Sequence, residues 1–504
     1  MLIKAGLFVL SGTLLGRLLG FLREAQLAAA FGAGQRAEAA IITLTLPDLL
    51  MNILLGGALS YALIPEFARM SESKSWQLHV QLTVLAALLF GFLAFLISFF
   101  PSNIIYIFNQ QLPDDLAKQT HYAISISAWL MPLIGMAGVT TAYLQTNNRF
   151  LSAAFSTSIY NGILVVCLFG ITQGLLNGDE LIWLAGAMIG GGLVRYLVLW
   201  INSKRYMPRG QLDPGGWLVK SSLMKSYLLA LLGSAAILSL PLIGRIFAAQ
   251  YGEGALAQFN YASKLIELPL GVAISVISVV ALPALAKAHQ VSFQAGQSEH
   301  TVEWQTLLFR SLRFSILLSI VIMLPCIWFA ASLADIAFGW GKMDSASLDG
   351  VAKLTTVGFV LLLLQGGISI TSAALASAKG MRMIAWSGLV GMLAFASMAI
   401  ISIRQGGLIV LMYALILAYS LVLLIQMYEL GEKHHIRWKL FMADTNLNFP
   451  LLAVLSAFAM LSLLFDRFQE NPWIGLSLAA MFTIVLSVVV LAASSEIKHK
   501  IFRR

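Results

Sequence analysis

Long apolar segments separated by short polar ones fill the chain from end to end. A helix that crosses a bilayer needs about 20 consecutive, mostly apolar residues. Applying this length predicts fourteen spanning helices, at residues 5–31, 36–67, 77–100, 117–145, 150–174, 180–202, 222–250, 253–287, 305–338, 348–377, 381–403, 406–429, 448–466 and 472–496. The longest of these indicate tilted, kinked or protruding helices. The pattern therefore predicts an all-α integral membrane protein.

Composition supports this class. Of the 504 residues, 59% are hydrophobic and only 11% are charged, whereas a soluble domain carries roughly 25% charged residues. The first apolar run continues into an arginine-bearing stretch, so we expect an uncleaved first span and not a signal peptide. The two cysteines, Cys167 and Cys326, lie in separate apolar runs, which argues against a disulfide framework or a zinc site.

The charge of the loops predicts the orientation of the chain. With the N-terminus inside, the inner loops and helix ends hold nineteen lysines and arginines, and the outer ones hold five. The positive-inside rule expects this asymmetry, so both termini are predicted to be cytoplasmic. The same bias accounts for the net charge of +9, and we expect no nucleic-acid partner.

Two similar units indicate an internal repeat. "AFGAG" at 30–34 is followed after about thirty residues by "ALIPEFARM" at 62–70. "QYGEG" at 250–254 is followed at a similar interval by "VALPALAKA" at 280–288. Each unit has a glycine turn, a long helix, a proline near the helix end and a basic residue. The alternative explanation is chance, because such hairpins recur in helical membrane proteins.

The offset between the two units implies a domain organisation. It is about 220 residues and contains six predicted spans, an even number, so both copies face the same way. We therefore predict two parallel six-helix lobes, residues 1–210 and 211–440, and two extra C-terminal helices in residues 441–504. Parallel repeats of this kind are typical of transporters, with the substrate site between the lobes.

The first predicted helix carries charges at depths where charge is costly. A charged side chain at the bilayer centre costs about 2.5–3.5 kcal/mol on insertion scales, so such residues normally face protein or water. Arg17 and Glu24 are seven residues apart and share one helix face, while Arg23 points about a third of a turn away from Arg17. The same helix repeats glycine every four residues, a spacing that allows close packing or local unwinding, at Gly12, Gly16 and Gly20.

Charged residues also lie within later predicted spans. Glu38 and Asp48 are on the second helix. Apart from a functional role, Glu38 has the alternative of being solvated near the outer water. The alternative for Asp48 is that it satisfies backbone donors freed by the preceding proline. In the second repeat, Arg245 lies near the end of the seventh span. Lys264 and Glu267 on the eighth span are three residues apart, so they are able to neutralise each other.

Two interpretations of the first-helix arginines follow. One is an inert structural role, and the other is a cationic cavity between the lobes. Cations in such a cavity suit an anionic substrate, because arginine binds phosphate with two parallel hydrogen bonds and stays charged. We therefore predict that Arg17 and Arg23 line a path for a negatively charged molecule.

Three segments carry a family resemblance. "GRLLGFLREAQLAAAFGAGQRAEAAIITLTLPDLL" at 16–50 resembles the first two helices of the MurJ (MviN) family of lipid II flippases, within the multidrug/oligosaccharidyl-lipid/polysaccharide (MOP) exporter superfamily. "NNRFLSAA" at 147–154 is similar to that family's turn before its fifth helix, and "YASKLIELPLGVAISVISVVALPALAKA" at 261–288 to its eighth helix. The likeness extends over the whole chain, and 16–50 is its most specific part.

The resemblance implies a function and a site. It implies a flippase of the bacterial inner membrane that moves undecaprenyl-pyrophosphate-linked peptidoglycan precursor, lipid II, to the outer leaflet by alternating access. The two last helices would form a groove for the lipid tail, and cell-wall synthases are reasonable partners. By position, the resemblance implies a cationic substrate-binding cavity of Arg17, Arg23 and Lys264. The gating or charge-pairing residues that it implies are Glu24, Glu38, Asp48 and Glu267.

Several residues depart from the family pattern, so a cargo other than lipid II is an alternative. Met51 stands where the family often has an arginine, Gly56 where it often has an acidic residue, and Lys264 where it has an arginine. "LASAKGMRMIAW" at 375–386 replaces a more polar turn. The alternative cargo is another polyprenyl-linked oligosaccharide, such as an exopolysaccharide or O-antigen unit.

Two other classes are less consistent with the sequence. A cation-coupled drug exporter of the same superfamily should have an acidic, aromatic cavity, and this cavity is predicted to be basic. An enzyme of the polyprenyl-phosphate pathway should show clustered catalytic groups, but no HExxH, Ser-His-Asp spacing or GxxxxGK[ST] occurs. We therefore expect a transporter that is not an enzyme, has no cofactor or metal, and is driven by membrane potential or an ion gradient.

Overall fold

The computed structural model confirms the predicted all-α class. It describes residues 2–54, 59–108, 112–147, 149–208, 216–219, 221, 235–274, 277, 281–282, 284–289, 298–378, 380–403, 406–442, 445–465 and 471–493. Every regular element in these residues is a helix. Gly56, one of the departures from the family pattern, lies outside the described residues.

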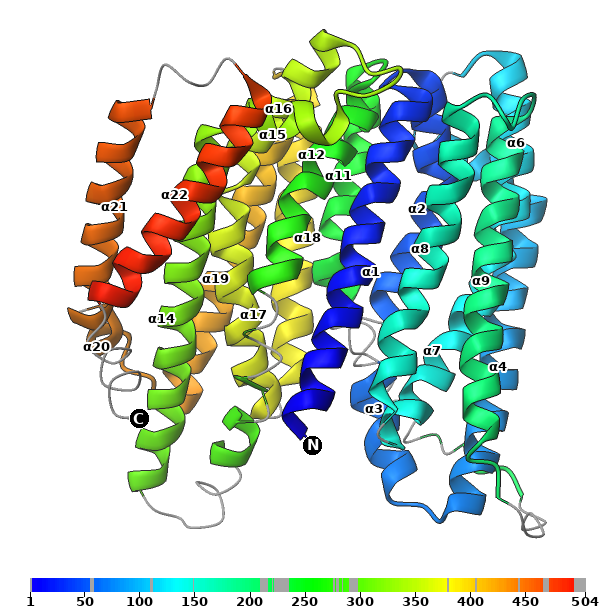
Figure 1. The fold of residues 1–504 in the computed structure, drawn as a ribbon. Coiled ribbons are helices and arrows are strands. Elements are labelled where there is room, and N and C mark those ends of the chain that lie inside the picture. The colour runs from blue at the N-terminus through cyan, green and yellow to red at the C-terminus, as the bar shows by residue number, and fades with distance from the viewer. Residues whose placement is uncertain are drawn as a thin grey trace. The chain divides into compact units, whose positions relative to one another are not determined.

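The chain forms two compact units. The first consists of residues 1–260 and 341–344. Its helices are α1 (Leu2–Phe31), α2 (Gln35–Ile53), α3 (Leu59–Ala68), α4 (Glu72–Phe99), α5 (Pro101–Ile107), α6 (Asp114–Ser127), α7 (Leu130–Thr146), α8 (Phe150–Thr172), α9 (Glu180–Lys204), α11 (Leu240–Ala248), the 3-10 turn Ala249–Tyr251 and the first part of α12 (Ala255–Pro269). Within this unit α8 packs against both α1 and α9 (Figure 1).

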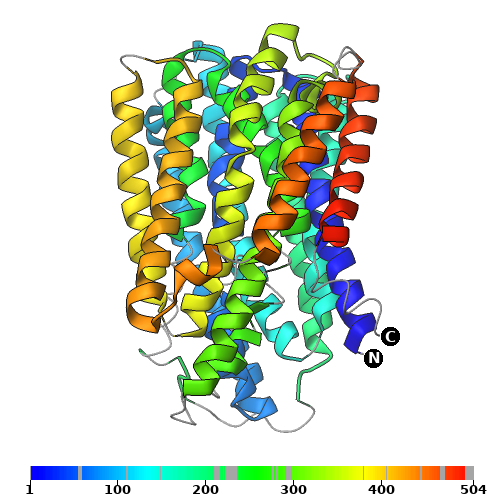
Figure 2. The same ribbon diagram turned by 90° about the vertical axis from the view of Figure 1, so that its left-hand side faces the viewer.

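The second unit consists of residues 261–340 and 345–504. After α12 it continues with a short π-helix, Leu270–Ile274, and then with α14 (Ser298–Trp328), α15 (Ala330–Phe338), α16 (Ser345–Gly358), α17 (Leu361–Ser377), α18 (Met381–Ile403), α19 (Ile409–His434), α20 (Trp438–Met442), α21 (Thr445–Phe465) and α22 (Pro472–Ala493). The last two helices pack on each other and on α14, as the orange and red ribbons of Figure 2 show. Phe329 and Phe482 are buried at the centre of that contact.

Nine helices in the described part of the chain are long and apolar enough to cross a membrane, or ten if α16 and α17, bent by 45°, form one span. The count of fourteen therefore stays a prediction. The predicted span 36–67 is divided between α2 and α3, with residues 55–58 outside the described part. The predicted span 222–250 begins in residues 222–234, which are also outside it.

The two glycine turns of the predicted repeat touch each other within the first unit. Gly254 has a φ of +82°, and a Cβ there would lie 2.9 Å from the carbonyl oxygen of Ala33. A Cβ on Gly34 would lie 3.4 Å from a carboxylate oxygen of Glu253. The first unit therefore includes the second turn and extends past residue 210, to residue 260. The division of the repeat into two six-helix lobes, with boundaries after residues 210 and 440, stays a prediction.

The glycine repeat of α1 serves close packing. Helix α1 is continuous, and its glycines face α8: a Cβ on Gly12 would lie 2.8 Å from the Cβ of Ala154. At the next positions, Ser158 Oγ donates to the Gly12 carbonyl at 3.5 Å, and Asn161 Nδ2 donates to the Gly16 carbonyl at 3.1 Å. Small residues let the two backbones approach and exchange these bonds. The glycine spacing allowed either close helix packing or local unwinding of α1, and the structure shows close packing.

Replacing Gly12 with alanine should destabilise the first unit, because the new methyl group meets Ala154 and the ring of Phe155. Overpacking of this kind costs about 1–3 kcal/mol, and we expect a lower thermal unfolding midpoint for the purified protein. Gly162→Ala on α8 is the matched control, since nothing lies within 4 Å of its added Cβ. Equal midpoints for the two variants would contradict the packing assignment.

Candidate functional site

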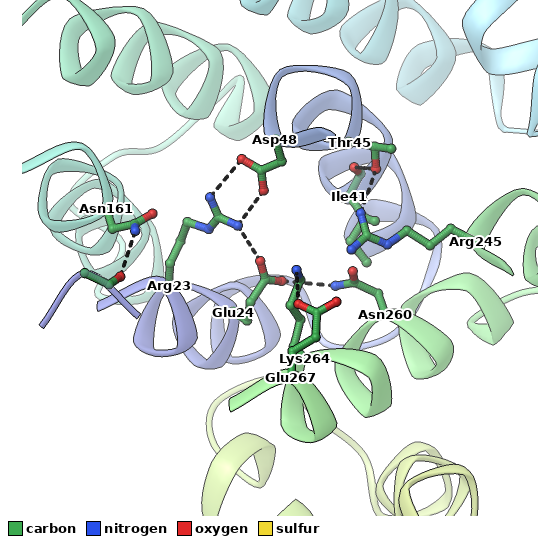
Figure 3. Close-up of polar contacts among 11 residues, drawn as sticks. Arg23, Glu24, Ile41, Thr45, Asp48, Asn161, Arg245, Asn260, Lys264 and Glu267 are labelled. Carbon is green, nitrogen blue, oxygen red and sulfur yellow. Dashed lines mark hydrogen bonds and ion pairs between the residues drawn. The ribbon is translucent and has the colours of Figure 1, made fainter. Parts of the chain in front are cut away.

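A buried ion-pair cluster joins α1 and α2. Arg23 is 5% exposed, and its Nη1 and Nη2 donate to the two carboxylate oxygens of Asp48 at 3.1 and 2.6 Å. Nη2 also donates to Glu24 Oε1 at 2.6 Å (Figure 3). The two parallel bonds to Asp48 are the fork geometry in which arginine binds carboxylates most strongly. The cluster thus compensates a charge that the interior of a membrane protein tolerates only when it is paired.

The backbone of α2 is adapted to place Asp48 in this cluster. Pro47 lies inside the helix and has no N–H to donate to the carbonyl of Thr43 four residues earlier. Ser127 at the end of α6 donates its hydroxyl to that carbonyl at 3.4 Å. The hydroxyl of Ser127 also lies 3.2 Å from the carbonyl of Ile124, so its one proton is shared and the acceptor freed by the proline is only partly satisfied.

Asn260 on α12 extends the cluster. Its Nδ2 donates to Glu24 Oε2 at 3.0 Å, so the two oxygens of Glu24 bind a guanidinium and an amide. Asn260 is 1% exposed and Glu24 is 3% exposed. Three helices of the first unit, α1, α2 and α12, are joined at this point.

Glu38 acts as a helix cap. It is fully buried, at 0% exposure, so the alternative that it is solvated is wrong. Its Oε1 accepts a hydrogen bond of 3.2 Å from the backbone N–H of Leu256 in the first turn of α12. A carboxylate is favourable there because it satisfies an unpaired helical donor and faces the positive end of the helix dipole. In the same unit, Arg245 Nη1 lies 3.5 Å from the hydroxyl of Thr45, which itself donates to the carbonyl of Ile41 at 2.6 Å.

The remaining site residues predicted from the sequence lie in different surroundings. Arg17, two turns from Glu24, is exposed. In the second unit, Lys264 Nζ donates to Glu267 Oε2 at 2.8 Å, with side-chain exposures of 15% and 39%. The i, i+3 spacing therefore forms a local ion pair. Met51 is 6% exposed and part of the core.

The charges of the first-unit cluster nearly cancel. One guanidinium, on Arg23, faces two carboxylates, on Glu24 and Asp48, so the ionised cluster sums to −1 (1 − 2). Arg23 is thus held by carboxylates, whereas the sequence predicted a cation facing a cavity. Binding an anion through both Nη groups of Arg23 requires that a carboxylate leaves them first. The substrate-binding and gating roles stay predictions.

Sequence reasoning missed three buried polar residues of the first unit. Asn260 was missed because asparagine is uncharged, and the search was for charged residues within apolar spans. Arg195 on α9 is 1% exposed, and Tyr160 on α8 is 0% exposed. A single arginine in the middle of the predicted span 180–202 was the available signal for Arg195, by the same cost argument that drew attention to Arg23.

A polytopic helix bundle that neutralises charged groups inside its membrane-spanning part is typical of the multi-pass membrane transporters. Residues 27–487 match the family model described as "Lipid II flippase MurJ", and the chain belongs to that family. A curated relative is the lipid II flippase MurJ of Burkholderia cenocepacia, 29% identical over 378 residues, which cover 72% of this chain and 70% of the relative.

Solved structures show the same fold. "Lipid II flippase MurJ, inward closed conformation" superposes with a TM-score of 0.75 at 18% identity and covers 96% of this chain and 99% of that one. An inward-facing multidrug resistance MATE family transporter of the MOP superfamily has a TM-score of 0.67 at 14% identity, covering 85% and 96%. The family expected from the three sequence segments is confirmed.

Replacing Asp48 with alanine should destabilise the protein, because the buried Arg23 guanidinium loses two of its three hydrogen bonds to carboxylates. Leaving a buried donor of a charged group unsatisfied costs at least about 1–3 kcal/mol. Replacing Arg23 and Asp48 with leucine and Glu24 with glutamine should recover much of this loss, because no charge then remains in the cluster. Unfolding midpoints of the purified protein measure both effects.

The control is the Arg36–Glu180 pair in the same unit, at 3.0 Å, where the Arg36 side chain is 62% exposed. Exposed pairs contribute at most about 1 kcal/mol, so Glu180→Gln should change the midpoint little. A loss in Asp48→Ala no larger than that in Glu180→Gln would contradict the assignment of the Arg23 cluster as a compensated buried charge.

Proposed function

We propose that this protein translocates lipid II, the undecaprenyl-pyrophosphate-linked peptidoglycan precursor, from the inner to the outer leaflet of the bacterial cytoplasmic membrane by alternating access. Membership of the lipid II flippase family supports the cargo. The observation that carries the mechanism is the two-point bond between Arg23 and Asp48 inside the first unit. It supports the proposal because a side chain suited to phosphate lies in the membrane-spanning part with its charge compensated, ready for an anionic cargo.

The proposed step is an exchange of anions on Arg23. A pyrophosphate offers oxygens in the same fork geometry as the carboxylate of Asp48, with more negative charge. When cargo binds, Asp48 leaves the guanidinium and the phosphate takes its place. The helix that carries Asp48 contains Pro47, which removes one backbone bond next to the moving residue. Glu24, bonded also to Asn260, keeps Arg23 in position during the exchange.

Arg17 and Lys264 have supporting roles in this proposal. Arg17 is exposed, and an arginine within a spanning helix faces water more readily than lipid. It is therefore suited to attract the anionic head group. Lys264 pairs with Glu267 at 2.8 Å and becomes available to the cargo by the same kind of exchange. Glu38 stabilises α12 as a cap and holds α2 beside it.

The protein acts as a transporter without chemical conversion of its cargo. We propose that both termini are cytoplasmic, that membrane potential or an ion gradient drives the cycle, and that cell-wall synthases receive the cargo. The alternative cargo is another polyprenyl-linked oligosaccharide. It is favoured by Met51 and Lys264, which stand where the family pattern has arginines and reduce the number of two-point phosphate contacts.

Expression of this protein should rescue a bacterium whose own lipid II flippase has been shut off. Survival and the fraction of lipid II exposed on the outer leaflet are scored together. Arg17→Ala and the near-isosteric Asp48→Asn should lose most of the exposure while remaining in the membrane, and Arg36→Gln should retain it because Arg36 lies in an exposed pair. No rescue by protein that is inserted and folded would contradict lipid II as cargo and favour the alternative glycan.

Collapsing the membrane potential should stop the movement of lipid II in the rescued cells. Carrying a charge across 100 mV is worth about 2.3 kcal/mol, which is enough to bias two states of similar free energy. Outer-leaflet lipid II is measured before and after an ionophore that dissipates the electrical potential. A second ionophore that exchanges protons without changing the potential is the control. Unchanged exposure after both treatments would contradict a potential or proton gradient as the driving force.

A further inference from the structure

A second buried arginine of the first unit has a different environment from Arg23. Arg195 on α9 is 1% exposed, and its Nε, Nη1 and Nη2 have no hydrogen-bond partner among the described residues. A guanidinium stays protonated in proteins, and a buried charge without a partner is among the most unfavourable arrangements in a folded chain. The side chain therefore requires an acceptor other than these residues.

Tyr160 on α8 faces the same place. It is 0% exposed, and its hydroxyl likewise has no partner among the described residues. Helices α8 and α9 are antiparallel, because Cys167 contacts the Trp183 carbonyl while a Cβ on Gly191 would lie 3.2 Å from the Tyr160 ring. Side chains lean toward the N-terminus of their helix, so Tyr160 leans from Gly191 toward Arg195. The two residues interact electrostatically.

The two carboxylates that interact electrostatically with Tyr160, Asp48 and Glu24, already have hydrogen-bond partners. Asp48 binds Arg23 with both oxygens, and Glu24 binds Arg23 and Asn260. What Arg195 and Tyr160 present is a set of hydrogen-bond donors. A water molecule that accepted from both would bring two O–H groups in need of acceptors of their own. An anion accepts from both and also compensates the charge.

We propose that a small monovalent anion of the halide class binds inside the first unit between the guanidinium of Arg195 and the hydroxyl of Tyr160. Both side chains are closed off from the protein surface, at 1% and 0% exposure, so the occupant is small and is not a pyrophosphate head group. The site adjoins the Arg23 cluster, because Tyr160 also interacts electrostatically with Asp48 and Arg23. It does not depend on lipid II as cargo. The bound anion neutralises α9 where it packs on α8.

The test uses the full-length protein purified in detergent. Thermal unfolding midpoints are measured at constant ionic strength while chloride replaces gluconate, an anion too large for the site. Binding to the folded state alone raises the midpoint continuously with anion concentration. We expect this rise in the wild type and in Arg36→Gln, a variant of an exposed arginine in the same unit. The rise should be lost in Arg195→Gln, and Tyr160→Phe should need about tenfold more chloride.

Bromide locates the site independently of any variant. Crystals of the wild type grown in bromide should give an anomalous peak within hydrogen-bonding distance of the Arg195 guanidinium. If Arg195→Gln fails to fold, this peak alone decides. A peak confined to other arginines, only water beside Arg195, or a chloride effect that survives in a folded Arg195→Gln protein would overturn the proposal. None of these measurements involves transport. A negative result for the anion site therefore does not contradict the proposed function, and failure to rescue cells does not contradict the anion site.

Discussion

A positive charge inside a membrane-spanning helix has to be neutralised by the protein itself, and the centre of the first unit is arranged around that requirement. Arg23 on α1 is matched by its neighbour Glu24 and by Asp48 from α2. Asn260 then satisfies the second oxygen of Glu24. The carboxylates compensate the guanidinium, and the amide of Asn260 then satisfies a carboxylate oxygen. The contacts of a single arginine therefore join three helices.

The two helices that share the Arg23–Asp48 pair differ in rigidity. Helix α1 is uninterrupted and packs on α8 through its glycines, with side-chain bonds to the Gly12 and Gly16 carbonyls. Helix α2 contains Pro47, and the carbonyl that the proline leaves unpaired shares one hydroxyl of α6 with a carbonyl of α6 itself. The guanidinium of Arg23 is therefore on the continuous helix α1, and the carboxylate of Asp48 is on the proline-containing helix α2. An exchange of partners on Arg23 then needs movement mainly of α2.

Apolar periodicity and insertion cost were sufficient to predict the helical membrane class and to single out Arg23, Glu24, Asp48 and the local Lys264–Glu267 pair. They were insufficient to predict that Arg23 pairs with Asp48, because the rotation of one helix relative to another is decided by packing. The cap formed by Glu38 depends on where α12 begins, which periodicity locates only within several residues. Asn260 and Tyr160 carry no charge, so a search for costly ions passes over them.

The sequence separations of these contacts bear on biogenesis. The partners Arg23 and Asp48 are 25 residues apart, so both leave the ribosome in the same helical hairpin. Asn161 and Gly16 are 145 residues apart, and at about 5–20 residues per second their synthesis is separated by about 7–30 s. During that interval the glycine face of α1 has no α8 to pack against. The early ion pair lets Arg23 enter the membrane already bound to a carboxylate of its own hairpin, before α8 is available to pack on α1.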